Sequence, residues 1–254
     1  MSSIKEVLFG EQEKQAEKWV RERLTDQNLT VESEEWQSLL NDYSAYQDYL
    51  NDEYEWISEI KWLKENGSVD IYQNFVTELT NIKKLAENSL SEPIPLNENL
   101  IIKMCYSYSV TLLEAFLGDS IKALISENKV YLNNAIERLE QIRNTKYSLF
   151  DLSKSGMDLS GLAIKCVSEV LFHKIDKTME MYEKVLGCKI NIDTSKVKLI
   201  IDIRHDIVHR NGYTKENEVI DILPHNLYQA ITDIKHLVNK LQKIIANQKL
   251  KDYK

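Results

Sequence analysis

Residues 200–214, with the sequence IIDIRHDIVHRNGYT, bring together the side chains of this chain that are best suited to chemistry. Two of the five histidines, His205 and His209, stand four positions apart. His209 falls in the last turn of the helix that the pattern predicts, where the negative end of the helix dipole favours the imidazolium form. A histidine in this position can donate a proton near neutral pH. The segment therefore predicts a site for acid–base chemistry.

The helix that must position these groups carries an apolar stripe with a cation on it. Five residues recur at the i, i+3, i+4, i+7 and i+11 spacing of one helical face: Val197, Ile200, Ile201, Arg204 and Val208. A lone cation on an apolar stripe is costly unless it meets an anion. His209 follows Arg204 by five positions, which places it about 140° around the helix. The two side chains can therefore act on one ligand only at the helix end or when two chains contribute.

The motif RHDIVH at 204–209, followed by RNG, resembles the Arg-x4-His signature of the HEPN superfamily. This all-helical family is rich in RNA-cleaving toxins and antiviral defence nucleases. The family pattern has a polar residue directly after the arginine, and here that residue is His205. The apolar helix before the motif, the Asn211–Gly212 stop and a closing helix also fit. The resemblance covers residues 96–254 and does not explain residues 1–90.

The resemblance implies endoribonuclease activity without a metal or other cofactor. In this chemistry the ribose 2′-OH attacks the adjacent phosphate, which requires a proton carrier and a cation for the developing charge. His209 would carry the proton, and Arg204 would stabilise the charge because a guanidinium binds phosphate oxygens in pairs. The resemblance also implies a homodimer that lines one cleft with two motifs. A regulatory partner such as an antitoxin or an ATPase would be consistent with a toxin or phage-defence role.

The neighbouring residues of the motif have two open interpretations each. His205 and Asp206 either hydrogen-bond the substrate or cap and solvate the helix end. Arg210 and Asn211 could contact phosphate, although Asn211 also suits a helix stop in the left-handed conformation. Arg204 itself could instead form a buried ion pair.

Two polar residues lie inside apolar helical patterns elsewhere in the chain. Glu114 occurs in TLLEAFLGDS and His173 in SEVLFHKID. Members of the family often place a polar residue of a neighbouring helix at the active site, so both are candidates. The alternative for each is a polar group of the core whose hydrogen bonds are satisfied. Asp202 and Glu114 are the candidate ion-pair partners of Arg204.

A rival interpretation uses the same letters. HDIVH has the spacing of the two histidines that bind zinc in HExxH hydrolases. Asp206 stands where a glutamate is expected, and the third ligand would have to come from His225, Glu216 or Asp221. Two further alternatives are a non-catalytic HEPN-like module that binds RNA, nucleotides or protein, and a structural helical adaptor. The first of these keeps the fold and loses the reaction.

The rest of the sequence predicts an all-α protein. Seven glycines and three prolines in 254 residues leave little material for turns. Helices are predicted at about 31–66, as one helix or as two broken near Asp52, and at 70–88, 99–117, 119–127, 132–146 and 159–186. Gly118 is expected to end the helix at 99–117, and Gly187 the helix at 159–186. Two more are predicted from about 193 to 210, with Asp193, Thr194 and Ser195 as candidate N-caps, and from Pro224 to about 247. Residues 217–223 could form a short β segment.

Charge and proline placement predict two regions. Pro93 and Pro95 mark a boundary between an acidic, aromatic-rich region at 1–92 and a HEPN-like domain at 96–254. Residues 1–90 carry 9 Lys/Arg and 19 Asp/Glu, whereas residues 91–254 carry 23 and 21. Aromatic residues at Trp36, Tyr43, Tyr46, Tyr54, Trp56 and Trp62 predict a helix–helix seam. Three cysteines without CxxC spacing, no signal peptide and no run of 18 apolar residues predict a cytoplasmic protein outside the membrane.

Overall fold

The computed structural model describes residues 4–91, 98–148 and 158–252, and these residues form an all-α fold. The only β pairing among them is an isolated bridge between Tyr213 and Val219. The short β segment expected at residues 217–223 therefore forms no strand. The predicted fold class is thus confirmed. The chain divides into two compact units, residues 1–59 and 60–254, which are described separately.

The first unit contains α1 (Ile4–Arg21) and most of α2 (Glu34–Glu65). Its small core consists of Val20, Leu24 and Trp36, with Trp19 packed alongside. The Trp19 ring lies 5.5 Å from Tyr43 and 6.3 Å from Tyr46, measured between centroids. The predicted aromatic seam is therefore present at this end of α2. Further along the helix Tyr54 is 72% exposed.

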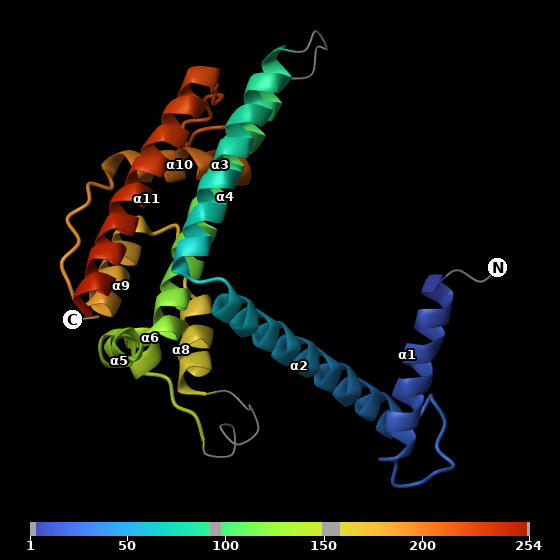
Figure 1. The fold of residues 1–254 in the computed structure, drawn as a ribbon. Helices are drawn as coiled ribbons and strands as arrows, with labels where there is room; N and C mark the ends of the chain where they lie inside the picture. Colours follow the sequence, from blue (N-terminus) through green and yellow to red (C-terminus); the bar gives the residue numbers. More distant parts are fainter. Residues whose placement is uncertain (1–3, 92–97, 149–157, 253–254) are drawn as a thin grey trace. The chain divides into compact units, whose positions relative to one another are not determined.

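The second unit is built around α4 (Glu98–Glu127), which contacts α3 (Ser68–Ser91), α5 (Lys129–Arg138), α8 (Leu159–Ser168), α9 (Ile175–Leu186), α10 (Ser195–His209) and α11 (Pro224–Asp252). A one-turn helix, α6 (Glu140–Arg143), follows α5. Helices α3, α4 and α11 run alongside one another, and α10 crosses α4 and α11 (Figure 1). Their facing sides form one continuous apolar core.

The apolar composition of α4 follows from this central place. Residues 99–127 are long and apolar enough, by length and composition alone, to cross a membrane. The same composition is required of a helix that contacts six others, because most of its circumference faces apolar side chains. Val110, Leu113, Leu117, Ile121 and Leu124 are fully buried.

Gly118 was predicted to end a helix, but α4 continues through it. A Cβ atom at this position would lie 3.0 Å from Cε2 of Phe172. The glycine therefore permits close approach of the segment between α8 and α9. That segment, residues 169–174, also interrupts the predicted helix 159–186, which is observed as α8 and α9. Gly187 ends α9 with φ +69°, in the left-handed conformation expected of it.

The two units divide upstream of the predicted boundary. Residues 92–97, which contain both boundary prolines, lie outside the described residues. Helix α3 packs against α4 and α11, so it belongs to the second unit although it precedes those prolines. The excess of acidic residues lies in the first unit also when the chain is divided after residue 59. Residues 1–59 carry 5 Lys/Arg and 15 Asp/Glu, and residues 60–254 carry 27 and 25.

Candidate functional site

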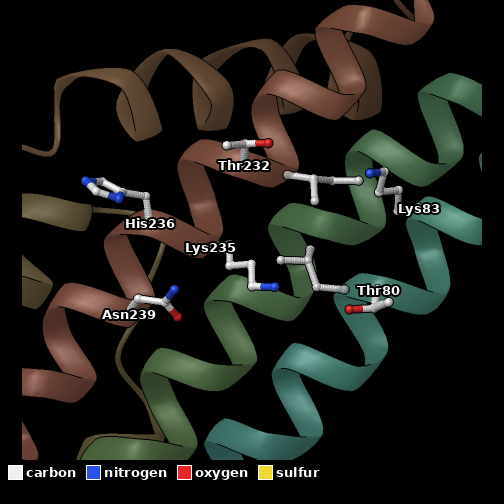
Figure 2. A pocket seen from close by; sticks show the side chains of 8 residues that line it. Thr80, Lys83, Thr232, Lys235, His236 and Asn239 are labelled. Carbon is white, nitrogen blue, oxygen red and sulfur yellow. The ribbon is translucent and has the colours of Figure 1, made fainter.

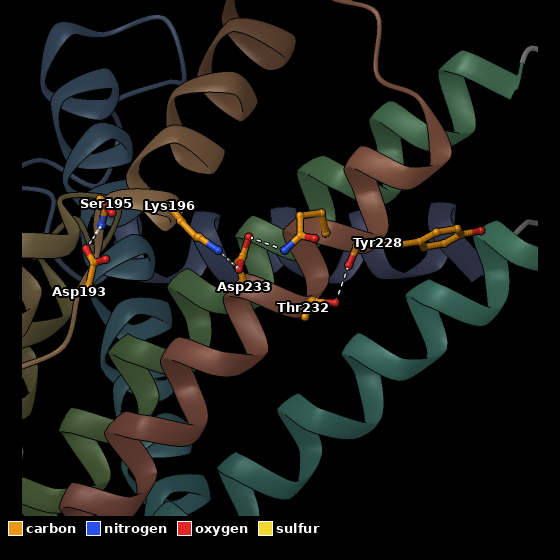
Figure 3. Close-up of polar contacts among 7 residues, drawn as sticks. Asp193, Ser195, Lys196, Tyr228, Thr232 and Asp233 are labelled. Carbon is orange, nitrogen blue, oxygen red and sulfur yellow. Dashed lines mark hydrogen bonds and ion pairs between the residues drawn. The ribbon is translucent and has the colours of Figure 1, made fainter.

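The motif helix α10 is held at its N-terminal end by polar contacts. Lys196 Nζ lies 3.2 Å from Asp233 Oδ1 on α11, and Figure 3 shows this side chain spanning the two helices. Asp193 accepts the Ser195 backbone N–H at 3.0 Å, and this hydrogen bond lowers the pKa of its carboxyl. The predicted caps thus divide their work: Thr194 occupies the N-cap position, while Asp193 satisfies the Ser195 N–H.

A second tie joins α10 to the start of α9. Asp176 accepts a hydrogen bond from the Thr194 hydroxyl at 2.8 Å and pairs with Lys198. The bond from Lys198 is the main cause that lowers the pKa of the Asp176 carboxyl. Because both ties lie in the first turn of α10, they fix the axis along which the motif residues project.

The apolar stripe of α10 is buried as far as Ile201. Val197, Ile200 and Ile201 enter the main core, whereas Val208 is 48% exposed. Arg204, one turn after Ile200, is half-buried. Its Nε atom is buried and has no hydrogen-bond partner. No ion pair joins it to Asp202, Glu114 or another described residue, so the expected pairing is not formed.

The two histidines of the motif lie side by side on the exposed surface of α10. The centroids of the His205 and His209 rings are 4.6 Å apart, as the four-residue spacing predicts. Arg204 lies partly inside the bundle while both imidazoles face solvent. Within one chain, therefore, the arginine and His209 diverge as the helical geometry requires.

The end of α10 is stabilised by its own neighbours. Asp206 and Arg210 form an ion pair one turn apart. Asn211 and Gly212 adopt φ values of +55° and +81°, which turn the chain out of the helix. Asn211 thus forms the expected left-handed stop, and Asp206 pairs with Arg210; contact of either residue with a substrate stays a prediction.

Lys103, which lies outside the motif, approaches the same turn from α4. Its Nζ atom would lie 3.0 Å from a Cβ atom at Gly212. Lys103 is the only charged residue between Asn99 and Leu113, which was the available signal. It adds a half-buried ammonium beside the C-terminal end of the motif helix.

A groove of about 400 Å³ runs between the start of α9 and the exposed side of α10. It brings together two predicted candidates, His173 and His205, which are 32 positions apart in the sequence. Three lysines also line it, Lys174, Lys177 and Lys198, together with Asp176 and Asp202. The groove can therefore present ammonium and imidazole groups to an anionic ligand.

Glu114 lies apart from this groove. It is half-buried on α4, and its Oε1 atom is buried without a hydrogen-bond partner. Glu114 is therefore not the core polar group with satisfied hydrogen bonds that was the alternative expectation. Among the described residues, no hydrogen bond or ion pair joins Glu114 to the histidines of the motif.

The zinc interpretation lacks a third ligand among the described residues. These contain no group of three or more His, Cys, Asp or Glu side chains placed to hold a metal ion. Of the proposed third ligands, Asp221 instead accepts a hydrogen bond from Asn99, and His225 and Glu216 are exposed. His205 and His209 are thus a pair of imidazoles without a completed ligand set.

Comparison with known proteins adds no relative: the chain matches no family model, no curated protein and no solved structure.

Proposed function

We propose that this protein is a metal-independent endoribonuclease of the HEPN type. The observation that carries the proposal is the arrangement at the C-terminal half of α10, where exposed His205 lines a groove with three lysines and His173, and His209 lies beside His205 outside that lining. Arg204 supports it, since no acid among the described residues pairs with its half-buried guanidinium, and an external anion could balance that charge. The resemblance of residues 204–209 to the family signature points to RNA as that anion.

The reaction assigns one task to each group. The ribose 2′-oxygen forms a bond to phosphorus as the bond from phosphorus to the 5′-oxygen breaks. His209 carries the proton, and Arg204 stabilises the charge on the non-bridging oxygens. Lys103 and the groove lysines hold the flanking phosphates by charge. The products are a 2′,3′-cyclic phosphate and a 5′-OH.

A homodimer would bring the diverging groups of two chains to one substrate. Arg204 and His209 of a single α10 point in different directions, so a second α10 completes the site. The outer side of α10 offers apolar contact for it, since Leu199 is 64% and Ile203 37% exposed. Leu100, Met104 and Tyr108 form a further exposed apolar row on α4 at i, i+4 and i+8. Exposed apolar rows of this kind are typical of protein–protein contacts.

The dimer is tested by sedimentation velocity at tens of micromolar. We expect wild type to sediment as a dimer and Ile203→Asp as a monomer with little remaining cleavage. Leu250→Asp, at an exposed apolar position near the end of α11, is the matched control and should stay dimeric. A monomeric wild type that cleaves RNA would exclude the shared site.

The second candidate is a non-catalytic RNA-binding module. It is favoured by the lysine-lined groove, which can bind phosphate without any proton transfer. The two candidates differ in their dependence on His209.

The reaction is tested with total RNA in the presence of EDTA. We expect wild type to cleave, and His209→Ala to lose about 10²-fold or more of the rate, which is the usual contribution of a general acid or base. His225→Ala removes an exposed histidine outside the motif and should cleave like wild type. If no RNA is cleaved but RNA still binds, the binding module is the function. Cleavage that EDTA stops and zinc restores would instead refute the metal-free mechanism.

A further inference from the structure

A second groove lies between α3 and α11, and carboxylates are absent from its described lining. Its volume is about 420 Å³, which is within the range of small-molecule sites. Leu79 and Ile231 form an apolar floor, and both are largely buried. Polar side chains surround that floor (Figure 2): Thr80, Lys83, Thr232, Lys235, His236 and Asn239. Two of the lining residues are lysines, and none is an acid.

Two hydrogen-bond donors of the groove, Lys235 and the Asn239 amide, have no acceptor among the described residues. Lys235 extends from α11 towards α3 and has no ion-pair partner among the described residues (Figure 2). Asn239 uses its Oδ1 atom to accept the Tyr72 hydroxyl at 2.8 Å, which leaves its amide N–H groups as donors. Lys83 is the most engaged, since its Nζ atom lies 3.7 Å from Glu87 and 5.8 Å from the Tyr228 ring centroid.

The hydroxyl groups of the groove can only accept. Thr80 donates its hydrogen to the Val76 carbonyl at 2.7 Å, and Thr232 donates to the Tyr228 carbonyl at 2.8 Å. Each oxygen keeps a lone pair for an incoming O–H or N–H group. The groove therefore combines cationic donors, hydroxyl acceptors and an apolar floor.

We propose that the α3–α11 groove binds a nucleoside phosphate. The phosphate would meet Lys235 and the Asn239 amide, the ribose hydroxyls would donate to Thr80 or Thr232, and the base would occupy the remaining part of the groove. The nucleotide has two possible sources, a free mononucleotide or a segment of an RNA strand. Only the strand source rests on the proposed ribonuclease function, where the groove would hold RNA away from the motif helix.

The test measures binding to the full chain with His209→Ala in the background, so that RNA stays intact. Probes are adenosine monophosphate, adenosine, inorganic phosphate and an oligoribonucleotide without secondary structure. Lys235→Glu should weaken binding of the monophosphate roughly tenfold or more, equivalent to about 1.4 kcal/mol. Lys129→Glu makes the same change of charge at an exposed site on α5 and should change binding less than about twofold. Thermal unfolding of both variants should match that of the parent, because both lysines are exposed.

The probes separate the sources and the failures. Comparable affinity for the monophosphate and the oligonucleotide indicates a free nucleotide, and preference for the oligonucleotide indicates a strand. The proposed nucleotide site is refuted if none of the four probes binds. It is also refuted if Lys235→Glu and Lys129→Glu weaken binding equally. If the groove binds the monophosphate while wild type cleaves no RNA, the ribonuclease proposal is refuted and the nucleotide site is supported. If wild type cleaves RNA and Lys235→Glu changes the binding of no probe, the ribonuclease proposal stands and the nucleotide site in the groove is refuted.

Discussion

Arg204 combines two properties that bear on its role. It occupies a stripe whose earlier members are buried, and its Nε atom is buried without a partner. A buried polar group in this state costs stability, because the hydrogen bond to water is lost and not replaced. A residue kept at such a cost is consistent with a role toward an external anion.

We therefore predict that Arg204→Leu separates stability from activity. The substitution should leave the free energy of unfolding unchanged or raise it by about 1 kcal/mol, since the leucine fills the same stripe without an unsatisfied donor. RNA cleavage should be lost, and Arg204→Lys should also cleave poorly, because an ammonium lacks the paired donors of a guanidinium. Urea unfolding and the RNA assay measure the two effects. Destabilisation by more than about 2 kcal/mol would assign Arg204 to the core.

Glu183 gives a prediction for acid stability. Its carboxylate accepts the Ile190 backbone N–H at 2.8 Å and lies 3.2 Å from Lys189 Nζ. The hydrogen bond from Ile190 is the first cause that lowers the pKa of Glu183 below its ordinary value of 4.5. A lowered folded pKa contributes stability above pH 4.5 that is lost as the pH falls through the folded value.

Glu183→Gln should accordingly cost about 1 kcal/mol at pH 7 and less at pH 3. Glu180→Gln, at an exposed position of α9, is the control and should show little change at either pH. Urea unfolding at both pH values gives the comparison. An equal loss at pH 7 and pH 3 would show that the charge of Glu183 is irrelevant.

At the scale of elements, the structure depends on how α4 passes its neighbours. Gly118 lets the Phe172 ring lie against the helix, and Tyr182 of α9 donates its hydroxyl to the Leu117 carbonyl at 2.7 Å. These adjacent contacts position the segment that leads into α9. His173 lies in that segment, so one glycine in α4 helps to place a side chain of the groove.

Gly118→Ala should therefore destabilise the protein although alanine favours helices. The intrinsic gain of about 0.5–1 kcal/mol is opposed by overpacking against Phe172, which typically costs about 1–3 kcal/mol. We expect a net loss of about 1 kcal/mol. In a Phe172→Ala background the same substitution should stabilise, which a double-mutant cycle by thermal or urea unfolding would detect. Additive effects would mean that the ring does not oppose the methyl group.

At the scale of the whole molecule, the acidic excess and the candidate site belong to different units. Residues 1–59 carry ten more acids than bases, whereas the unit with the motif has a slight excess of bases. A phosphate backbone would be repelled by the first unit at short range, within the ~8 Å screening length at physiological salt. This distribution favours a regulatory or specificity role for residues 1–59.

Two truncations should differ in consequence. Deleting residues 1–59 should leave a folded, helical protein that retains cleavage, because the second unit has its own core. Deleting residues 1–90 should leave an unstable product, since it also removes α3 and the buried Leu63, Phe75 and Leu79. Circular dichroism, thermal unfolding and the RNA assay provide the measurements. Loss of all cleavage by a well-folded 60–254 fragment would place part of the site in the first unit.

The sequence by itself determined the fold class and the helix that carries the motif. Scarce glycine and proline and the 3.6-residue periodicity are local signals, so they identified α10, its stop at Asn211–Gly212 and the pairing of His205 with His209. Local signals also placed Gly187 at the end of α9. The prediction that Gly118 ends a helix was wrong. The sequence does not distinguish a glycine that ends a helix from one that allows a neighbouring ring to pack closely.

Only the tertiary structure decided which distant residues share a surface. His173 and His205 meet in one groove, Lys103 approaches Gly212, and α3 joins α11 across more than 130 positions of sequence. Such contacts depend on how helices pack, and many packings satisfy the same apolar stripes. Packing also leaves Arg204 without an acid partner among the described residues, although Asp202 and Glu114 were both candidates by sequence. Periodicity fixes which side of a helix is apolar, and packing alone fixes what that side meets.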